Sequence, residues 1–308
     1  MEFSIYPGRY GCIPEEFCQY KEASIAILPI PYNGTSTWLK GSDRGPQALL
    51  DASSNMELYD IETDSEVFKR GIVTIDPVLC PDDPEAMVAV VHDRAKSIVN
   101  DGKFIVGIGG EHTISIGLIR AVAEKFSDLS VLQLDAHADT RDKYEGSRYN
   151  HACVMSRIAE ICPYVQAGIR SMDSSELERL NRNRTFFAHE ILNSPDVTHN
   201  ILKALTQNVY ITIDLDVFDP SIMPSTGTPE PGGLDWYTLI KLIELVVREK
   251  NVVGMDATEL LPNPANRSPD FMAAKLVYRV LSMIFTKRKE KVDGEKRSLK
   301  QTSRAYRH

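Results

Sequence analysis

Residues 131–139 read Val-Leu-Gln-Leu-Asp-Ala-His-Ala-Asp, an apolar run followed by three possible metal ligands at every second position. Side chains two residues apart point to the same face of an extended chain. If strand geometry persists that far, Asp135, His137 and Asp139 converge on one point. A divalent metal of intermediate softness accepts two carboxylates and an imidazole. A strand that ends in a solvated acidic turn fits the same residues, so the remainder of the chain has to decide.

Three further apolar runs end in acidic residues or histidine. They are residues 104–108 followed by Gly109-Gly110-Glu111-His112, residues 209–213 followed by Asp214 and Asp216, and residues 252–255 followed by Asp256 and Glu259. Ligands of an open parallel sheet bind outside the carboxyl ends of its strands. We therefore expect these side chains to meet those of residues 135–139 at one edge of a sheet.

The pattern of apolar segments predicts a three-layer α/β/α fold around a mostly parallel, eight-stranded central sheet. The predicted strands are 24–30, 71–76, 104–108, 131–134, 165–169, 185–188, 209–213 and 252–257. They are continuously apolar, as expected of strands with both faces covered, and most are separated by helices. The main predicted helices are 84–101, 113–126, 151–161, 174–183, 194–206, 235–250 and 268–285.

Composition indicates one large domain and excludes several classes of protein. The 308 residues are 43% hydrophobic and 25% charged, which is ordinary for a globular chain. We predict a single domain over 1–286 and a basic, disordered tail over 287–308, where nine Lys or Arg face three acids. The net charge of −8 argues against a nucleic-acid partner.

The sequence also predicts a cytoplasmic protein. No stretch approaches the roughly 20 apolar residues of a membrane span, and the first residues lack the apolar core of a secretory signal. The five cysteines are scattered and odd in number, which argues against a disulfide framework.

The candidate ligands outnumber the needs of one structural zinc, which takes four. They comprise four carboxylates and two imidazoles: His112, Asp135, His137, Asp139, Asp214 and Asp216. This set suits two metals. Mixed oxygen and nitrogen ligands favour manganese, while iron, cobalt, nickel and zinc stay open. Two neighbouring metals can lower the pKa of a bound water, so the predicted reaction class is metal-assisted hydrolysis.

The three motifs at 109–112, 135–139 and 214–220 together resemble the ureohydrolases, which comprise arginases, agmatinases and related guanidino hydrolases. The resemblance runs from about residue 25 to residue 285, and it implies the arginase-like fold with two Mn²⁺ per chain. By this resemblance one metal takes His112, Asp135, Asp139 and Asp214, and the other takes Asp135, His137, Asp214 and Asp216. Asp135 and Asp214 would bridge the two metals.

The same resemblance assigns four further residues. His151 matches the family's proton shuttle, a role that suits an imidazole because it titrates near neutral pH. Glu259 matches the carboxylate that pairs with the substrate guanidinium. Thr228 and Asp173 match substrate-facing positions. A surface histidine at a helix start, a turn hydroxyl and a helix N-cap are the alternatives for His151, Thr228 and Asp173, respectively.

The remaining acidic residues of these motifs are interpreted as structural. Glu111 is read as a supporting group rather than a ligand, Asp219 as a turn former before Pro220, and Asp256 as support for a loop.

Residues 140–148 and 227–234 resemble the agmatinase branch rather than arginases. The resemblance implies hydrolysis of agmatine to putrescine and urea, a step of polyamine biosynthesis, by a homo-oligomer (trimer or hexamer). Guanidinobutyrase, guanidinopropionase or arginase activity stays an alternative, as does a single-zinc deacetylase of the same fold.

Overall fold

Eight parallel strands form one sheet in the computed structural model, which describes residues 6–194 and 196–305. Across the sheet they lie in the order β2 (Ile72–Thr74), β1 (Ile25–Ile30), β3 (Phe104–Gly109), β8 (Asn251–Thr258), β7 (Asn208–Asp214), β4 (Leu129–Leu134), β5 (Tyr164–Ile169) and β6 (Thr185–Phe187). The eight strands predicted from the sequence are all present, and every pair is parallel.

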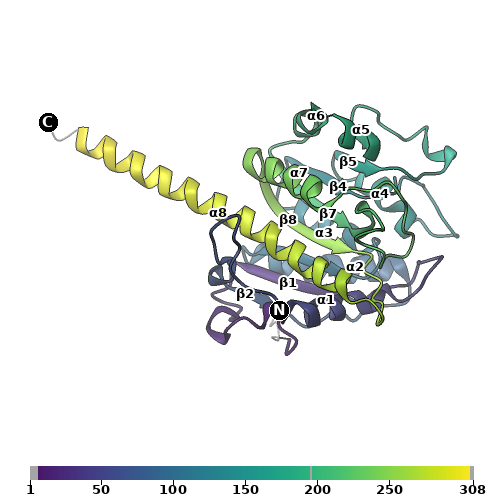
Figure 1. Ribbon diagram of the computed structural model, residues 1–308, viewed down its shortest axis with the longest axis horizontal. Coiled ribbons are helices and arrows are strands. Elements are labelled where there is room, and N and C mark those ends of the chain that lie inside the picture. Colours follow the sequence, from purple (N-terminus) through teal and green to yellow (C-terminus); the bar gives the residue numbers. More distant parts are fainter. Residues whose placement is uncertain (1–5, 195, 306–308) are drawn as a thin grey trace.

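Helices cover both faces of the sheet, which confirms the predicted three-layer α/β/α architecture (Figure 1). One layer holds α2 (Pro84–Asn100), α3 (Ile114–Ala123) and α4 (Val154–Ile158). The other holds α1 (Gly45–Ser53), α5 (Ala188–Asn193), α6 (Asp196–Ala204), α7 (Trp236–Glu249) and α8 (Ser268–Ala305). Each layer shares its own cluster of buried side chains with the sheet.

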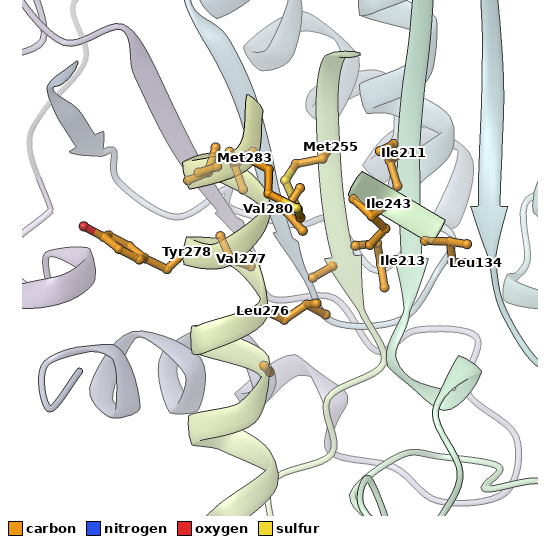
Figure 2. Packing of buried hydrophobic residues seen from close by; sticks show 14 of the residues in the cluster. Leu134, Ile211, Ile213, Ile243, Met255, Leu276, Val277, Tyr278, Val280 and Met283 are labelled. Atoms are coloured by element: carbon orange, nitrogen blue, oxygen red, sulfur yellow. The ribbon is translucent and has the colours of Figure 1, made fainter. Parts of the chain in front are cut away.

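Alternate residues of the central strands pack into different layers. Ile211 and Ile213 of β7 lie with Ile243 of α7 and Val280 of α8, as Figure 2 shows, whereas Tyr210 belongs to the opposite cluster. Because both sets of side chains are buried, the strand has to be apolar at consecutive positions.

Two predicted helices are replaced by much shorter helical turns in the structure. The predicted helix 174–183 is a single 3₁₀ turn, Ser174–Glu176, and the predicted helix 151–161 is a 3₁₀ turn, His151–Cys153, followed by α4. The capping box of Asp173 does begin a turn at Ser174. The following residues are polar apart from Leu177, which is 55% exposed, and Leu180, which is not buried, so no apolar face supports a longer helix.

The last helix runs further than the predicted 268–285. The backbone of α8 is helical through the basic segment to Ala305, and Figure 1 shows this part projecting from the body. Residues 306–308 lie outside the described residues. The boundary at 286 and a disordered tail stay predictions.

None of the helices in residues 6–194 and 196–305 combines the length and the hydrophobicity that a membrane span requires. The cytoplasmic location, the homo-oligomer and the absence of a nucleic-acid partner stay predictions from the sequence.

The strand order explains how distant motifs meet. The four strands followed by candidate ligands or acids, β3, β8, β7 and β4, are consecutive across the sheet. Since they are parallel, their carboxyl ends lie side by side at one edge.

We expect Ile211→Ala to lower the free energy of unfolding by about 2–5 kcal/mol, because it opens a cavity between the sheet and α7. Ile61→Ala is the matched control, since Ile61 is 82% exposed, and should change stability by less than about 0.5 kcal/mol. Urea denaturation followed by circular dichroism measures both values. Equal effects of the two substitutions would contradict the packing described here.

Candidate metal centre and its cavity

His112 lies at the centre of the first group of candidate ligands. Its Nδ1 is 3.1 Å from Asp135 Oδ2, 3.1 Å from Asp139 Oδ2 and 3.5 Å from Asp214 Oδ2. These side chains come from the ends of three strands, β3, β4 and β7. All four are buried, so the carboxylates meet the imidazole away from bulk water.

A second group forms around His137. Its Nδ1 is 2.8 Å from Asp216 Oδ2 and 3.7 Å from Asp135 Oδ1. Asp135 therefore presents one oxygen to each histidine, and it belongs to both sets of residues that could hold an ion. Two overlapping ligand sets that share a carboxylate are the arrangement expected of two neighbouring metals.

The strand geometry assumed from the sequence does not extend to Asp139. β4 ends at Leu134, and Asp139 has a left-handed backbone with φ of 52°. The three candidate ligands still converge, but Asp139 joins the group of His112 while His137 joins that of Asp216.

Backbone donors fix the carboxylates that follow β7. The Asp216 N–H donates to Asp214 Oδ1 at 3.0 Å, and the Ala136 N–H donates to Asp216 Oδ1 at 3.0 Å. These bonds tie the loop after β7 to the loop after β4, so the two groups keep their relative position.

The cluster concentrates negative charge. Burial and the charges of Asp139 and Asp216 raise the pKa of Asp135 to about 7. Burial and the neighbouring carboxylates also raise the pKa of Asp214 well above its ordinary value. Although burial alone would lower it, the charges of Asp216 and Asp135 raise the pKa of His137 to about 10. The site therefore favours added positive charge, which divalent cations supply.

Glu259 stands just past the end of β8 in a strained conformation, with φ of 65°. Its N–H donates to Gly110 O at 2.7 Å, and its Oε1 accepts from the His112 N–H at 2.8 Å. Burial and the charge of Glu111 raise its pKa to about 8. Gly110 has to be glycine, because a Cβ there would lie 1.9 Å from Tyr32 O.

A cavity of about 350 Å³ opens above this cluster. It is lined by all the candidate residues except Asp135: His112, His137, Asp139, His151, Asp173, Asp214, Asp216, Thr228 and Glu259. Asp135 is fully buried. The structure thus brings together the six candidate ligands and the four further residues that the resemblance assigns.

The two candidate substrate-facing residues lie toward the outer part of the cavity. Thr228 is exposed, in the loop that follows β7. Asp173 accepts hydrogen bonds from Ser175 N at 2.9 Å and from its hydroxyl at 2.6 Å. The N-cap interpretation of Asp173 is therefore confirmed, and the residue lines the cavity as well.

The sequence reading missed two contributions. The loop after β1, which includes Trp38, lines the cavity, and Arg141 and Tyr144 from the loop after β4 line it too. The signal was available for the first, since the apolar run 24–30 is another strand with its carboxyl end at this edge.

Arg170 was also missed. Its guanidinium donates to the carbonyls of Asp216 at 2.6 Å, Glu230 at 2.8 Å and Phe218 at 3.2 Å. It joins the loops after β5 and β7, and nothing in the sequence pattern marks a cation at that place.

Comparison with known proteins agrees with this geometry. A model of the arginase family matches residues 23–283. The N(1)-aminopropylagmatine ureohydrolase of Synechocystis sp. is 38% identical over 292 residues, covering 89% of this chain and 95% of that relative. The agmatinase of Pyrococcus horikoshii is 32% identical over 266 residues, covering 85% and 93%. The solved agmatine ureohydrolase of Thermoplasma volcanium superposes with a TM-score of 0.82 at 28% identity, covering 90% and 95%.

The overlapping ligand groups predict two divalent ions per chain. We expect His137→Ala to reduce the bound manganese to about one ion per chain, because only the second group loses a ligand. His92→Ala is the control, since His92 pairs with Glu124 outside the cluster, and should retain both ions. Metal analysis after dialysis against Mn²⁺ measures the content. One tightly bound zinc in the wild-type chain would contradict the two-metal arrangement.

Proposed function

Because the chain belongs to the arginase family, we propose that this ureohydrolase releases urea from agmatine or its N(1)-aminopropyl derivative. The observation that carries the proposal is the shared position of Asp135 between two ligand groups below a cavity that also holds Glu259. A hydrolytic centre and a carboxylate for a guanidinium then face the same space.

Two metals would be held by the residues implied by the resemblance. One would take His112, Asp135, Asp139 and Asp214, and the other Asp135, His137, Asp214 and Asp216. Their oxygen and nitrogen ligands suit Mn²⁺. When bound, the metals supply Lewis acidity and a nucleophile at neutral pH. The short contacts of His112 and His137 with these carboxylates support the assignment.

Glu259 would hold the guanidinium of the substrate. Its Oε1 accepts a hydrogen bond from the His112 N–H. Its Oε2 faces Gly227, and a Cβ placed on that glycine would still be 3.6 Å from this oxygen. A planar guanidinium donates paired hydrogen bonds to a carboxylate, which fixes its central carbon for attack.

His151 would carry the proton to the departing amine. It lines the cavity, its ring packs edge-on against Tyr144 at 6.1 Å between centroids, and it belongs to neither ligand group. A histidine that is near the metals without binding them is free to exchange protons.

Agmatine is the substrate predicted from the sequence, and N(1)-aminopropylagmatine is the second candidate. The relative from Synechocystis sp. is named for the latter. The added amine would extend toward the mouth of the cavity, where Trp38 is 74% exposed and Asp173 offers a carboxylate. An aromatic face and a carboxylate both attract an ammonium group. Loss of urea would leave putrescine from agmatine and a triamine from the longer substrate.

We expect the kcat/KM of the Mn²⁺-loaded protein to be at least about tenfold higher for agmatine and N(1)-aminopropylagmatine than for arginine, guanidinobutyrate and guanidinopropionate, a difference of roughly 1.4 kcal/mol. Arginine, guanidinobutyrate and guanidinopropionate each carry a carboxylate, which would approach the like-charged Asp173 at the cavity. Urea release across the five compounds measures the ratio. Higher activity on a carboxylate-bearing guanidine would refute the substrate assignment and leave the family unaffected.

We expect Glu259→Gln to lower kcat/KM by about 100-fold or more, since a charged guanidinium loses its anionic partner. His151→Asn should lower kcat by about 10²–10⁴-fold with a small change in KM, as expected of a lost acid–base group. Both variants should keep the wild-type manganese content, which metal analysis checks alongside the kinetics. Loss of manganese in His151→Asn would contradict its place outside the ligand groups.

A further inference from the structure

The side chain of Thr35 joins His151 to the loop after β1. Its Oγ1 accepts a hydrogen bond from the backbone N–H of His151 at 3.0 Å and lies 3.1 Å from His151 Nδ1. Thr35 is 9% exposed, so these contacts are protected from water. The residues are far apart in sequence, since Thr35 lies in the loop after β1 and His151 in the segment between β4 and β5.

Glu111 holds Thr35 from the other side. Its carboxylate is fully buried and accepts from Thr35 Oγ1 at 2.6 Å, Thr35 N at 2.8 Å, Thr113 Oγ1 at 2.9 Å and Ser36 Oγ at 3.1 Å. A carboxylate has no proton to donate, so each hydroxyl group in these hydrogen bonds is the donor and Glu111 the acceptor.

Counting protons then fixes the state of the His151 ring. The one hydroxyl proton of Thr35 goes to Glu111, and its two lone pairs are left to accept. One accepts from the His151 backbone N–H, and the other faces Nδ1. Thr113 Oγ1 lies 3.3 Å from Thr35 Oγ1 but has its own proton on Glu111, so it offers no alternative donor. Nδ1 therefore has to carry a proton.

We propose that Thr35, held by Glu111, is a positioning residue that keeps neutral His151 in the Nδ1–H tautomer. Nε2 has no hydrogen-bond partner among the described residues and belongs to a ring that lines the cavity. Its lone pair is then free to accept a proton. In the opposite tautomer Nδ1 is an acceptor, so the Thr35 hydroxyl would have to donate to it. Buried Glu111 would then lose its shortest hydrogen bond.

The catalytic consequence rests on the proposed function. As water adds to the guanidinium carbon, Nε2 accepts the proton that the attacking water releases. It returns this proton to the amine nitrogen while the carbon–nitrogen bond breaks. The second proton of the added water leaves the new carbon–oxygen group and also goes to the departing amine, so the guanidinium and water give urea and an ammonium. Throughout this transfer the Nδ1–H group keeps donating to Thr35 Oγ1, so the ring stays oriented. The imidazole ends with the same protons with which it began.

Nuclear magnetic resonance of the full chain tests the tautomer directly. The protein is labelled with ¹⁵N-histidine, loaded with diamagnetic Zn²⁺ and held at a pH where the ring is neutral, and His151→Asn identifies the signal among seven histidines. We expect the Nδ1–H form in the wild type and in Thr35→Ser, and a shift toward the Nε2–H form in Thr35→Val. Thr113→Val is the matched control, because it removes a hydroxyl from Glu111 without touching His151, and it should keep the Nδ1–H form.

Kinetics provides the second readout. We expect Thr35→Val to lower kcat for agmatine by about tenfold or more with KM within about twofold, as for a misplaced acid–base group, and Thr35→Ser to restore most of the loss. An Nε2–H form in the wild type, or an unchanged tautomer and kcat in Thr35→Val, would overturn the proposal. If Thr35→Val does not fold, the wild-type and Thr35→Ser spectra still decide.

These results also separate this inference from the proposed function. Should no guanidine be hydrolysed while the tautomer depends on the Thr35 hydroxyl, the proposed function fails and the positioning contact stands. If agmatine is hydrolysed and the His151 tautomer is unchanged in Thr35→Val, the proposed function stands and the positioning role is refuted.

Discussion

The burial of four aspartate carboxylates at one edge of the sheet is the constraint on which the rest of this structure depends. Like charges in a region without water repel strongly, and the two histidines and the backbone donors around them offset only part of that cost. Divalent ions would offset the remainder. Metal binding and the stability of the sheet edge are therefore coupled. The loops around the cavity carry these carboxylates, so their conformation depends on how the negative charge is balanced.

Most of the architecture could be predicted because it depends on local pattern. Continuous apolar runs identified all eight strands, and the helix predicted from residue 84 begins there as α2. The prediction of a helix over 174–183 was wrong, because a good helix start does not show whether the following residues can pack against the body of the protein. The strand order across the sheet depends on packing between distant segments, which a single sequence does not encode in any local signal.

The candidate site divides in the same way. Ligands spaced two apart after a strand are visible in the sequence, and every one of them reaches the cavity or the cluster below it. The contacts of Thr35 with Glu111 and of Arg170 with the carbonyls after β7 are invisible there, because they require knowing which strands are neighbours. Glu111 was rightly interpreted as a supporting group, but what it supports only the fold reveals.

The left-handed backbones of Asp139 and Glu259 set stability against activity at this edge of the sheet. On conformational grounds both positions prefer glycine, whose lack of a Cβ removes the strain. Both nevertheless hold carboxylates that face the cavity. A laboratory search for heat-resistant variants that ignores turnover would thus be drawn to these two positions and would erase the chemistry there, so any such selection has to score urea release together with melting temperature.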